Sequence, residues 1–106
     1  MKRGEIWTLQ DDGYASKARP VVVIQSDATD IFDSIVLCLF TTFKSSDIPT
    51  RVFISANKVN GLTKDSFVMT EKIVTVAKDA LGEKIGELAP DEMQNISQKL
   101  ALILGI

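Results

Sequence analysis

The sequence contains no histidine, and this absence excludes several kinds of site at once. Without imidazole, the chain cannot build His-assisted serine or cysteine nucleophiles, histidine acid–base pairs or His-ligated zinc sites. There is one cysteine, Cys38, so no disulfide can form within the chain. Because Cys38 lies inside an apolar segment, we expect its thiol to be buried and unreactive. Any catalysis must therefore use other side chains.

Long apolar runs and an excess of basic charge are also missing. The longest apolar runs, 21–24 and 35–40, fall far short of the about 20 residues that a membrane helix needs. The N-terminal residues lack the apolar stretch of a signal peptide, so we expect a cytoplasmic protein. Twelve basic and fourteen acidic residues give a net charge of −2, which disfavours non-specific nucleic-acid binding and leaves room only for local basic patches.

The 106 residues have the composition of one globular domain, 1–106, with 45% hydrophobic and 25% charged residues. Short runs rich in Val, Ile and Phe, separated by turn residues, predict six strands. The runs 21–24 and 35–40 lack alternation, which is typical of central strands covered on both faces. We place the strands near residues 5–9, 19–26, 34–41, 50–54, 66–72 and 84–87.

The last segment predicts a helix of about four turns. Pro90 suits the first helical position, and Asp91 and Glu92 suit the positive end of the helix dipole. One apolar stripe at helical spacing should face the core: Met93, Ile96, Leu100, Ile103 and Leu104. We therefore predict a mainly β protein with a C-terminal helix, arranged as a small, closed or partly closed antiparallel β-barrel.

Polar residues where two predicted strands begin and end are candidates for a site. Pro20 fixes the entry to its strand, so the Arg19 guanidinium would be well placed to clamp an oxyanion. Thr41 and Thr42 could bind phosphate oxygens and Lys44 could steer a polyanion, because all three follow an abruptly ending apolar strand. The alternatives are an ordinary surface arginine and ordinary turn-forming hydroxyls.

Other residues have simpler interpretations. Tyr14, in a polar loop, could stack on a base, whereas Trp7, in the first strand, is expected in the core or an interface. The spacing of Asp27, Asp30 and Asp33 is typical of a solvated loop, so we assign no metal and no cofactor.

Ordered blocks along the whole chain resemble the MazF/PemK toxin family. They are KRGEIW at 2–7, RPVVVIQSD at 19–27, LFTT at 39–42, Asp65-Ser66 leading to Glu71-Lys72-Ile73, and LGEKIGEL with PDE at 81–92. The resemblance implies an SH3-like barrel of the CcdB/PemK type. It also implies a homodimeric toxin that cleaves single-stranded messenger RNA at short sequences and is neutralised by a cognate MazE-like antitoxin.

The resemblance also assigns roles to residues. It implies that Arg19 and Thr41 are catalytic and that the RNA's own 2′-hydroxyl attacks phosphorus without a metal. The products would carry 2′,3′-cyclic phosphate and 5′-hydroxyl ends. Arg19 can stabilise the phosphoryl charge and Thr41 can donate to a phosphate oxygen. The substrate-binding residues would be Tyr14, Ser16, Lys17, Thr42, Lys44, Ser66, Glu71 and Lys72.

Two departures from the family pattern bear on substrate choice. The loop before Arg19 is one residue shorter and lacks the usual Glu-Gln pair, and Lys72 and Val74 replace a glutamine and an arginine. These changes predict that the RNA sequence cut by this protein differs from the sequences cut by family members that keep the usual residues. Two alternatives remain open: a CcdB-like toxin that binds DNA gyrase and cuts nothing, and a family member that retains only antitoxin binding.

Overall fold

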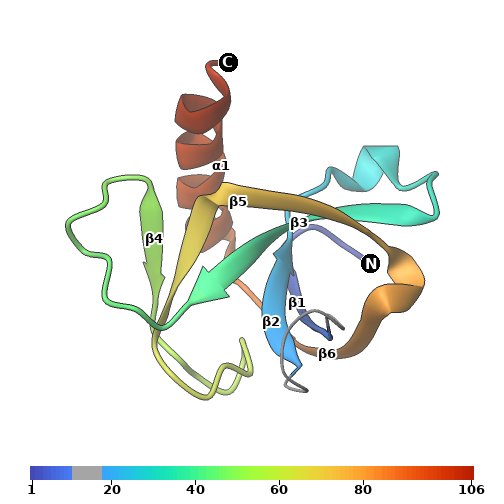
Figure 1. Ribbon diagram of the computed structural model, residues 1–106, viewed down its shortest axis with the longest axis horizontal. Coiled ribbons are helices and arrows are strands. Elements are labelled where there is room, and N and C mark those ends of the chain that lie inside the picture. The colour runs from blue at the N-terminus through green and yellow to red at the C-terminus, as the bar shows by residue number, and fades with distance from the viewer. Residues whose placement is uncertain (11–17) are drawn as a thin grey trace.

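Six antiparallel strands and one C-terminal helix form the protein (Figure 1), in a computed structural model that describes residues 1–10 and 18–106. The sheet has the order β4-β5-β3-β2-β1-β6. The mainly β fold with a C-terminal helix is therefore confirmed. The elements are β1 (Glu5–Leu9), β2 (Arg19–Val23), η1 (Asp27–Thr29), β3 (Ser34–Thr41), β4 (Arg51–Ile54), β5 (Ser66–Ala77), η2 (Lys78–Ala80), β6 (Leu81–Glu87) and α1 (Pro90–Leu104).

The two strands predicted to be central lie in the middle of the sheet and are covered on both faces. Val22 and Cys38 are fully buried in a cluster that includes Ile96 and Leu100 of α1. Val21 and Leu37 are fully buried in a second cluster on the opposite face. Continuous apolar sequence follows directly from this double burial, because successive side chains of a strand point to opposite faces.

The sheet is not closed into a barrel, because its edge strands β4 and β6 do not pair with each other. The segment after β4 covers β6 instead, with the Glu87 N–H donating to the Val59 carbonyl at 3.1 Å. Close approach here depends on two glycines. A Cβ at Gly86 would lie 2.3 Å from the backbone carbon of Asn60, and one at Gly61 would lie 2.0 Å from the Ile85 carbonyl oxygen. The 57–61 segment is therefore packed directly on the edge strand.

Three strand boundaries differ from the sequence expectation by three residues or more, and one of them is the start of β6, at Leu81 rather than near residue 84. β2 ends at Val23 rather than at residue 26, because the Gln25 side-chain oxygen accepts from the Val36 N–H at 3.0 Å and replaces a ladder bond. β5 continues to Ala77 rather than ending at residue 72. It does so because a bulge over residues 70–72 lets the strand resume pairing with β3, from Cys38 against Ile73.

The C-terminal helix is confirmed, but part of its predicted core stripe is wrong. Ile96 is fully buried and Leu100 is 8% exposed, whereas Ile103 and Leu104 are 39% and 56% exposed. Figure 1 shows the reason, since the last turns of α1 project past the sheet and have nothing to pack against. No helix in residues 1–10 and 18–106 is both long and apolar enough to cross a membrane.

Candidate functional site

Arg19 and Thr41 lie at the same end of two neighbouring strands. Arg19 is the first residue of β2 and Thr41 is the last residue of β3. The β2–β3 register pairs Val21 with Leu39, and two more steps along it place Arg19 opposite Thr41. Residues directly opposite in an antiparallel pair share a face of the sheet. The structure thus brings together two side chains that stand 22 positions apart in the sequence.

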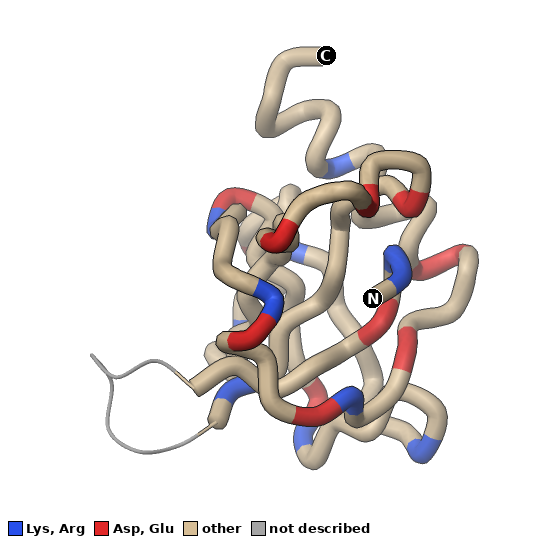
Figure 2. The backbone as a smooth tube through the Cα atoms, turned by 90° about the vertical axis from the view of Figure 1, so that its right-hand side faces the viewer, with Lys and Arg blue, Asp and Glu red and all other residues tan. Residues whose placement is uncertain are grey.

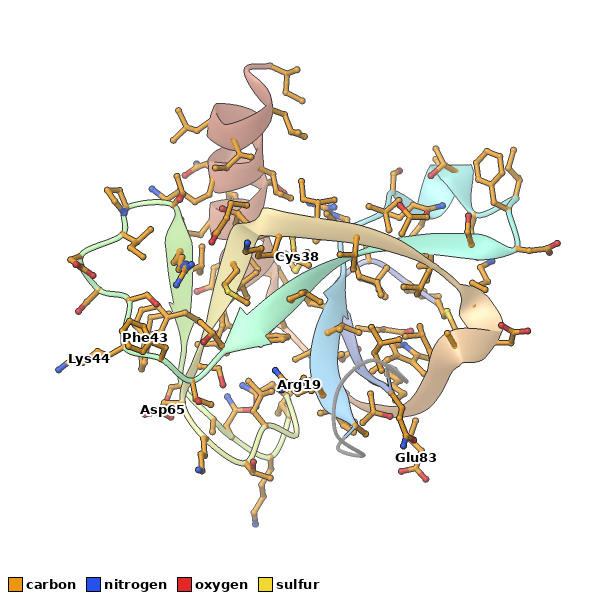
Figure 3. The ribbon with its side chains drawn as sticks, in the orientation of Figure 1. Arg19, Cys38, Phe43, Lys44, Asp65 and Glu83 are labelled. Carbon is orange, nitrogen blue, oxygen red and sulfur yellow. The ribbon has the colours of Figure 1, made fainter. Side chains whose placement is uncertain are left out.

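A groove of about 540 Å³ opens at this strand end. Among residues 1–10 and 18–106, its walls come from the start of β2, the end of β3 and the segment 63–66, so the groove combines the cationic side chains of Arg19 and Lys64 with several hydroxyls. Figure 3 shows Arg19 at the end of β2, where the groove lies. The lining residues are Ala18, Arg19, Pro20, Phe40, Thr41, Thr42, Thr63, Lys64, Ser66 and Met69.

The hydroxyls of the groove are oriented by local hydrogen bonds. Thr41 Oγ1 accepts from the Phe43 N–H at 3.1 Å, which leaves the Thr41 hydroxyl proton to be donated elsewhere. Ser66 is 3% exposed, and its Oγ donates to the Lys64 carbonyl at 2.9 Å. Ser66 therefore shapes the segment that carries Lys64, whereas Thr41 and Thr42 present hydroxyls at the groove.

Lys44 is not among the residues that line the groove. It is exposed, and Figure 3 shows Phe43 and Lys44 pointing outward from the loop after β3, away from Arg19. The loop holds this shape because the buried Ser45 Oγ donates to the Phe43 carbonyl at 2.8 Å. Contact of Lys44 with a ligand in the groove would require a substrate that extends beyond the groove's walls.

Glu71 and Lys72 lie in the β5 bulge and do not line the groove. Glu71 is held by Arg51, whose guanidinium donates to the carboxylate through Nη2 at 2.6 Å and Nε at 3.2 Å. Arg51 also donates from Nη1 to Ser45 Oγ at 2.9 Å. The bulge, β4 and the loop after β3 are therefore fastened together by one arginine. The hydrogen bond from Arg51 lowers the pKa of Glu71.

The lowered Glu71 pKa predicts a small acid-dependent loss of stability. A carboxyl whose pKa is depressed by folding stabilises the fold above its unfolded pKa, near 4.5, and this stabilisation is lost as the pH falls through the folded value. Because the pair is partly exposed, we expect less than about 1 kcal/mol. The free energies of unfolding of wild type and Glu71→Gln, measured in urea, should differ at pH 7, and the difference should be smaller at pH 3. An equal difference at both pH values would contradict this assignment.

The remaining predicted positions fall into two groups. Tyr14, Ser16 and Lys17 lie outside the described residues. Cys38 is buried as expected, and burial raises the pKa of its thiol to about 12, so it is not a nucleophile. Trp7 is half-buried against the second cluster, with Nε1 donating to Glu5 Oε1 at 3.0 Å, which confirms its core position.

Sequence reasoning missed three residues around the site. Thr63 and Lys64 line the groove, and the only signal for them was their position directly before Asp65-Ser66. Arg51 gave no signal, because its partners Ser45 and Glu71 are separated from it by 6 and 20 positions.

Charge is distributed locally rather than over one face. Figure 2 shows acidic and basic positions interspersed along the backbone. Within residues 1–10 and 18–106, no three acidic or cysteine side chains come together as a metal site would require. Arg19 and Lys64 give the groove its positive charge on a chain whose net charge is −2. An anionic ligand would therefore be recognised by this groove and not by the molecule's overall field.

Comparison with known proteins places a chain with this fold and groove among the small toxins of toxin–antitoxin systems. Residues 2–104 match the family described as the PemK-like, MazF-like toxin of type II toxin-antitoxin systems. A probable endoribonuclease MazF from Mycolicibacterium smegmatis is 35% identical over 107 residues, covering 100% of this chain and 98% of that protein. The chain belongs to the PemK/MazF toxin family. The prediction that it is an endoribonuclease is confirmed.

Solved structures support the same fold. An endoribonuclease in complex with its cognate antitoxin, from Mycobacterial species, matches with a TM-score of 0.84 and 27% identity, over 100% of this chain and 96% of that one. A MazE-MazF structure from Deinococcus radiodurans matches with a TM-score of 0.82 and 19% identity, over 100% and 96% of the two chains. The comparisons favour the endoribonuclease hypothesis over the gyrase-binding alternative.

Proposed function

We propose that residues 1–106 form one toxin domain that cleaves single-stranded messenger RNA at short sequences, without a metal ion, in the cytoplasm. The observation that carries the proposal is that Arg19, Thr41 and Lys64 line one groove. A guanidinium, an ammonium and hydroxyls converge there, and these are the groups that bind phosphate oxygens. The match to the endoribonuclease relative covers Arg19 and Thr41.

The proposed reaction is an internal transfer that uses the substrate's own nucleophile. The RNA 2′-oxygen attacks the adjacent phosphorus, the 2′-O–P bond forms, and the P–O5′ bond breaks. The 2′-hydroxyl proton is lost and the departing 5′-oxygen gains a proton, which leaves 2′,3′-cyclic phosphate and 5′-hydroxyl ends. The protein's task is to hold the 2′-oxygen in line and to stabilise the charge on the phosphoryl oxygens.

Arg19 and Thr41 have distinct roles in this reaction. The Arg19 guanidinium is a cation that offers two parallel N–H groups to the phosphoryl oxygens. Thr41 already accepts from the Phe43 N–H, so its O–H is available as a donor to a phosphate oxygen or to the 2′-oxygen. Thr42 and Lys64 would bind the flanking phosphates from the rim of the groove.

Cleavage in the presence of a chelator tests whether the reaction needs a metal ion. Metal-stripped protein should cut a long unstructured RNA as fast in EDTA as in magnesium, because no step calls for a metal. Mass spectrometry of the products should find 2′,3′-cyclic phosphate and 5′-hydroxyl ends. A requirement for magnesium, or 5′-phosphate ends, would show that the reaction proceeds differently.

We also propose that the toxin acts as a homodimer and is neutralised by an acidic, partly disordered antitoxin segment of the MazE type. Such a segment would cover Arg19, Lys44 and Lys72 and would compete with RNA for the same cations. The solved relatives include toxins in complex with their antitoxins. In the same assay, stoichiometric antitoxin should abolish cleavage, and a complex that left Arg19 exposed would contradict the proposed mode of inhibition.

A further inference from the structure

A second hollow of about 290 Å³ adjoins the groove. The two share six lining residues, so they form one continuous surface around the end of the sheet. The second hollow does not contain Arg19 or Thr41, and it adds Thr8, Gly61, Leu62 and Ile85. The shared residues are Ala18, Pro20, Thr42, Thr63, Lys64 and Ser66.

The sheet geometry explains why the two hollows are distinct. Pro20 is the neighbour of Arg19 in β2, so the two side chains point to opposite faces of the sheet. Pro20 pairs with Thr8 of β1, which places both on the face that does not carry Arg19. A ligand that occupies both hollows must therefore pass around the strand end. A single-stranded nucleotide can do this, because its phosphate and its base project from the ribose in different directions.

The lining of the second hollow fits the chemistry of a nucleobase. Pro20, Leu62 and Ile85 supply apolar walls, against which a planar base can pack. Thr8, Thr42 and Thr63 supply hydroxyls, which can donate to or accept from the edge of a base. A phosphate would fit this hollow less well, because Lys64 is the only cationic side chain among the described lining residues.

The segment 57–62, which brings Gly61 and Leu62 to the hollow, is held in shape by its own hydrogen bonds. Asn60 is 1% exposed, and its side-chain oxygen accepts from the N–H groups of Asn57 and Leu62, each at 3.0 Å. Its amide group donates to the Ser55 carbonyl at 2.9 Å. The contacts of Gly61 and Gly86 hold the same segment on β6. A wall fixed in this way loses little entropy when a base binds, which favours selective recognition.

Thr63 is the residue best placed to read the base, because Thr42, which also lines both hollows, directly follows Thr41 and is assigned to a flanking phosphate. Thr63 lines both hollows and is exposed. In the part of the chain that the structure describes, its hydroxyl makes no hydrogen bond to the protein. By comparison, Thr8 Oγ1 already accepts from the Glu83 N–H at 2.9 Å. The Thr63 hydroxyl can therefore satisfy a base edge without breaking an existing contact.

We propose that the second hollow binds one nucleobase next to the cleaved phosphodiester and that Thr63 sets the base preference at that position. The inference rests on the proposed endoribonuclease function and deepens it. Lys64, at the junction of the two hollows, holds the phosphate that links this nucleotide to its neighbour. The base preference at one position of the cut sequence then depends on Thr63 and on the hollow that it lines.

The test is to sequence the 5′-hydroxyl ends that each variant produces from a mixed RNA pool. Thr63→Val removes the hydroxyl at nearly constant volume and should reduce the preference at one position by roughly two- to tenfold, the effect of one hydrogen bond. Thr63→Tyr should fill the hollow and lower cleavage of the preferred sequence at least about tenfold. Thr75→Val and Thr75→Tyr are matched controls, because Thr75 is exposed on β5, where it pairs with Val36 far from the groove.

The outcomes separate this inference from the function on which it rests. An altered preference at one position in the Thr63 variants, with the wild-type pattern in the Thr75 variants, supports the inference. Active Thr63 variants with the wild-type pattern overturn it and leave the endoribonuclease proposal intact. A wild-type protein that yields no 5′-hydroxyl ends overturns both. Equal thermal unfolding midpoints for all variants would exclude misfolding as the cause of any change.

Discussion

Replacing Arg19 with alanine should lower the rate of RNA cleavage by about 100- to 1,000-fold, with the unfolding midpoint unchanged. The size of the loss follows from removing one preorganised donor to a developing oxyanion, which typically costs this factor. The fold should tolerate the change because Arg19 is exposed at the first position of β2. Single-turnover cleavage of a defined RNA, followed together with urea unfolding, measures both quantities.

Two further variants make the Arg19 result specific. Arg19→Lys keeps the charge but loses the two-pronged geometry, so it should restore only part of the rate. Lys78→Ala removes a cation at the other end of β5, where the lysine pairs with Asp30, and should leave cleavage at the wild-type rate. A similar loss in Lys78→Ala would mean that overall charge is responsible, and full activity of Arg19→Ala would refute the catalytic assignment.

Leu100→Ala should lower the free energy of unfolding by about 2–5 kcal/mol, whereas Leu104→Ala should change it by less than about 0.5 kcal/mol. The two positions stand one turn apart on α1 and undergo the same substitution. They differ in burial, since Leu100 is 8% exposed within the first core cluster and Leu104 is 56% exposed. Urea unfolding monitored by circular dichroism gives both values under one set of conditions.

The Leu100 and Leu104 pair also tests where the helix stops contributing to the fold. The apolar spacing of the sequence assigns both residues to the core, but the structure buries only the first. Similar losses for both variants would mean that the last turn of α1 is covered in solution. A negligible loss for Leu100→Ala would contradict the packing of α1 on the sheet.

Features encoded by neighbouring residues could be predicted from the sequence. The continuous apolar runs identified β2 and β3, because double burial removes the need for alternation. Pro90 and the acidic residues after it identified the start of α1. Arg19 and Thr41 could be proposed as candidates because each stands where an apolar strand meets a polar loop.

Features that depend on contacts between distant elements could not be predicted. The end of α1 is exposed because it extends past the sheet, and no local sequence pattern records where the helix leaves the sheet. Arg51 joins Ser45 and Glu71 through a bulge whose existence depends on the β3–β5 register. Thr63 and Lys64 reach the groove because the segment after β4 folds back over β6.

Gly61 and Gly86 let the 57–62 segment pack directly on β6, and this has a consequence for redesigning the enzyme. Gly86 lines neither hollow, yet a methyl group there would meet Asn60 and Val59 backbone atoms at 2.3–2.4 Å and push the 57–62 segment off β6. Libraries aimed at new cut sequences should therefore vary Thr63 and keep both glycines constant. The chain separates positions that can be mutated for specificity from positions that must stay fixed for shape.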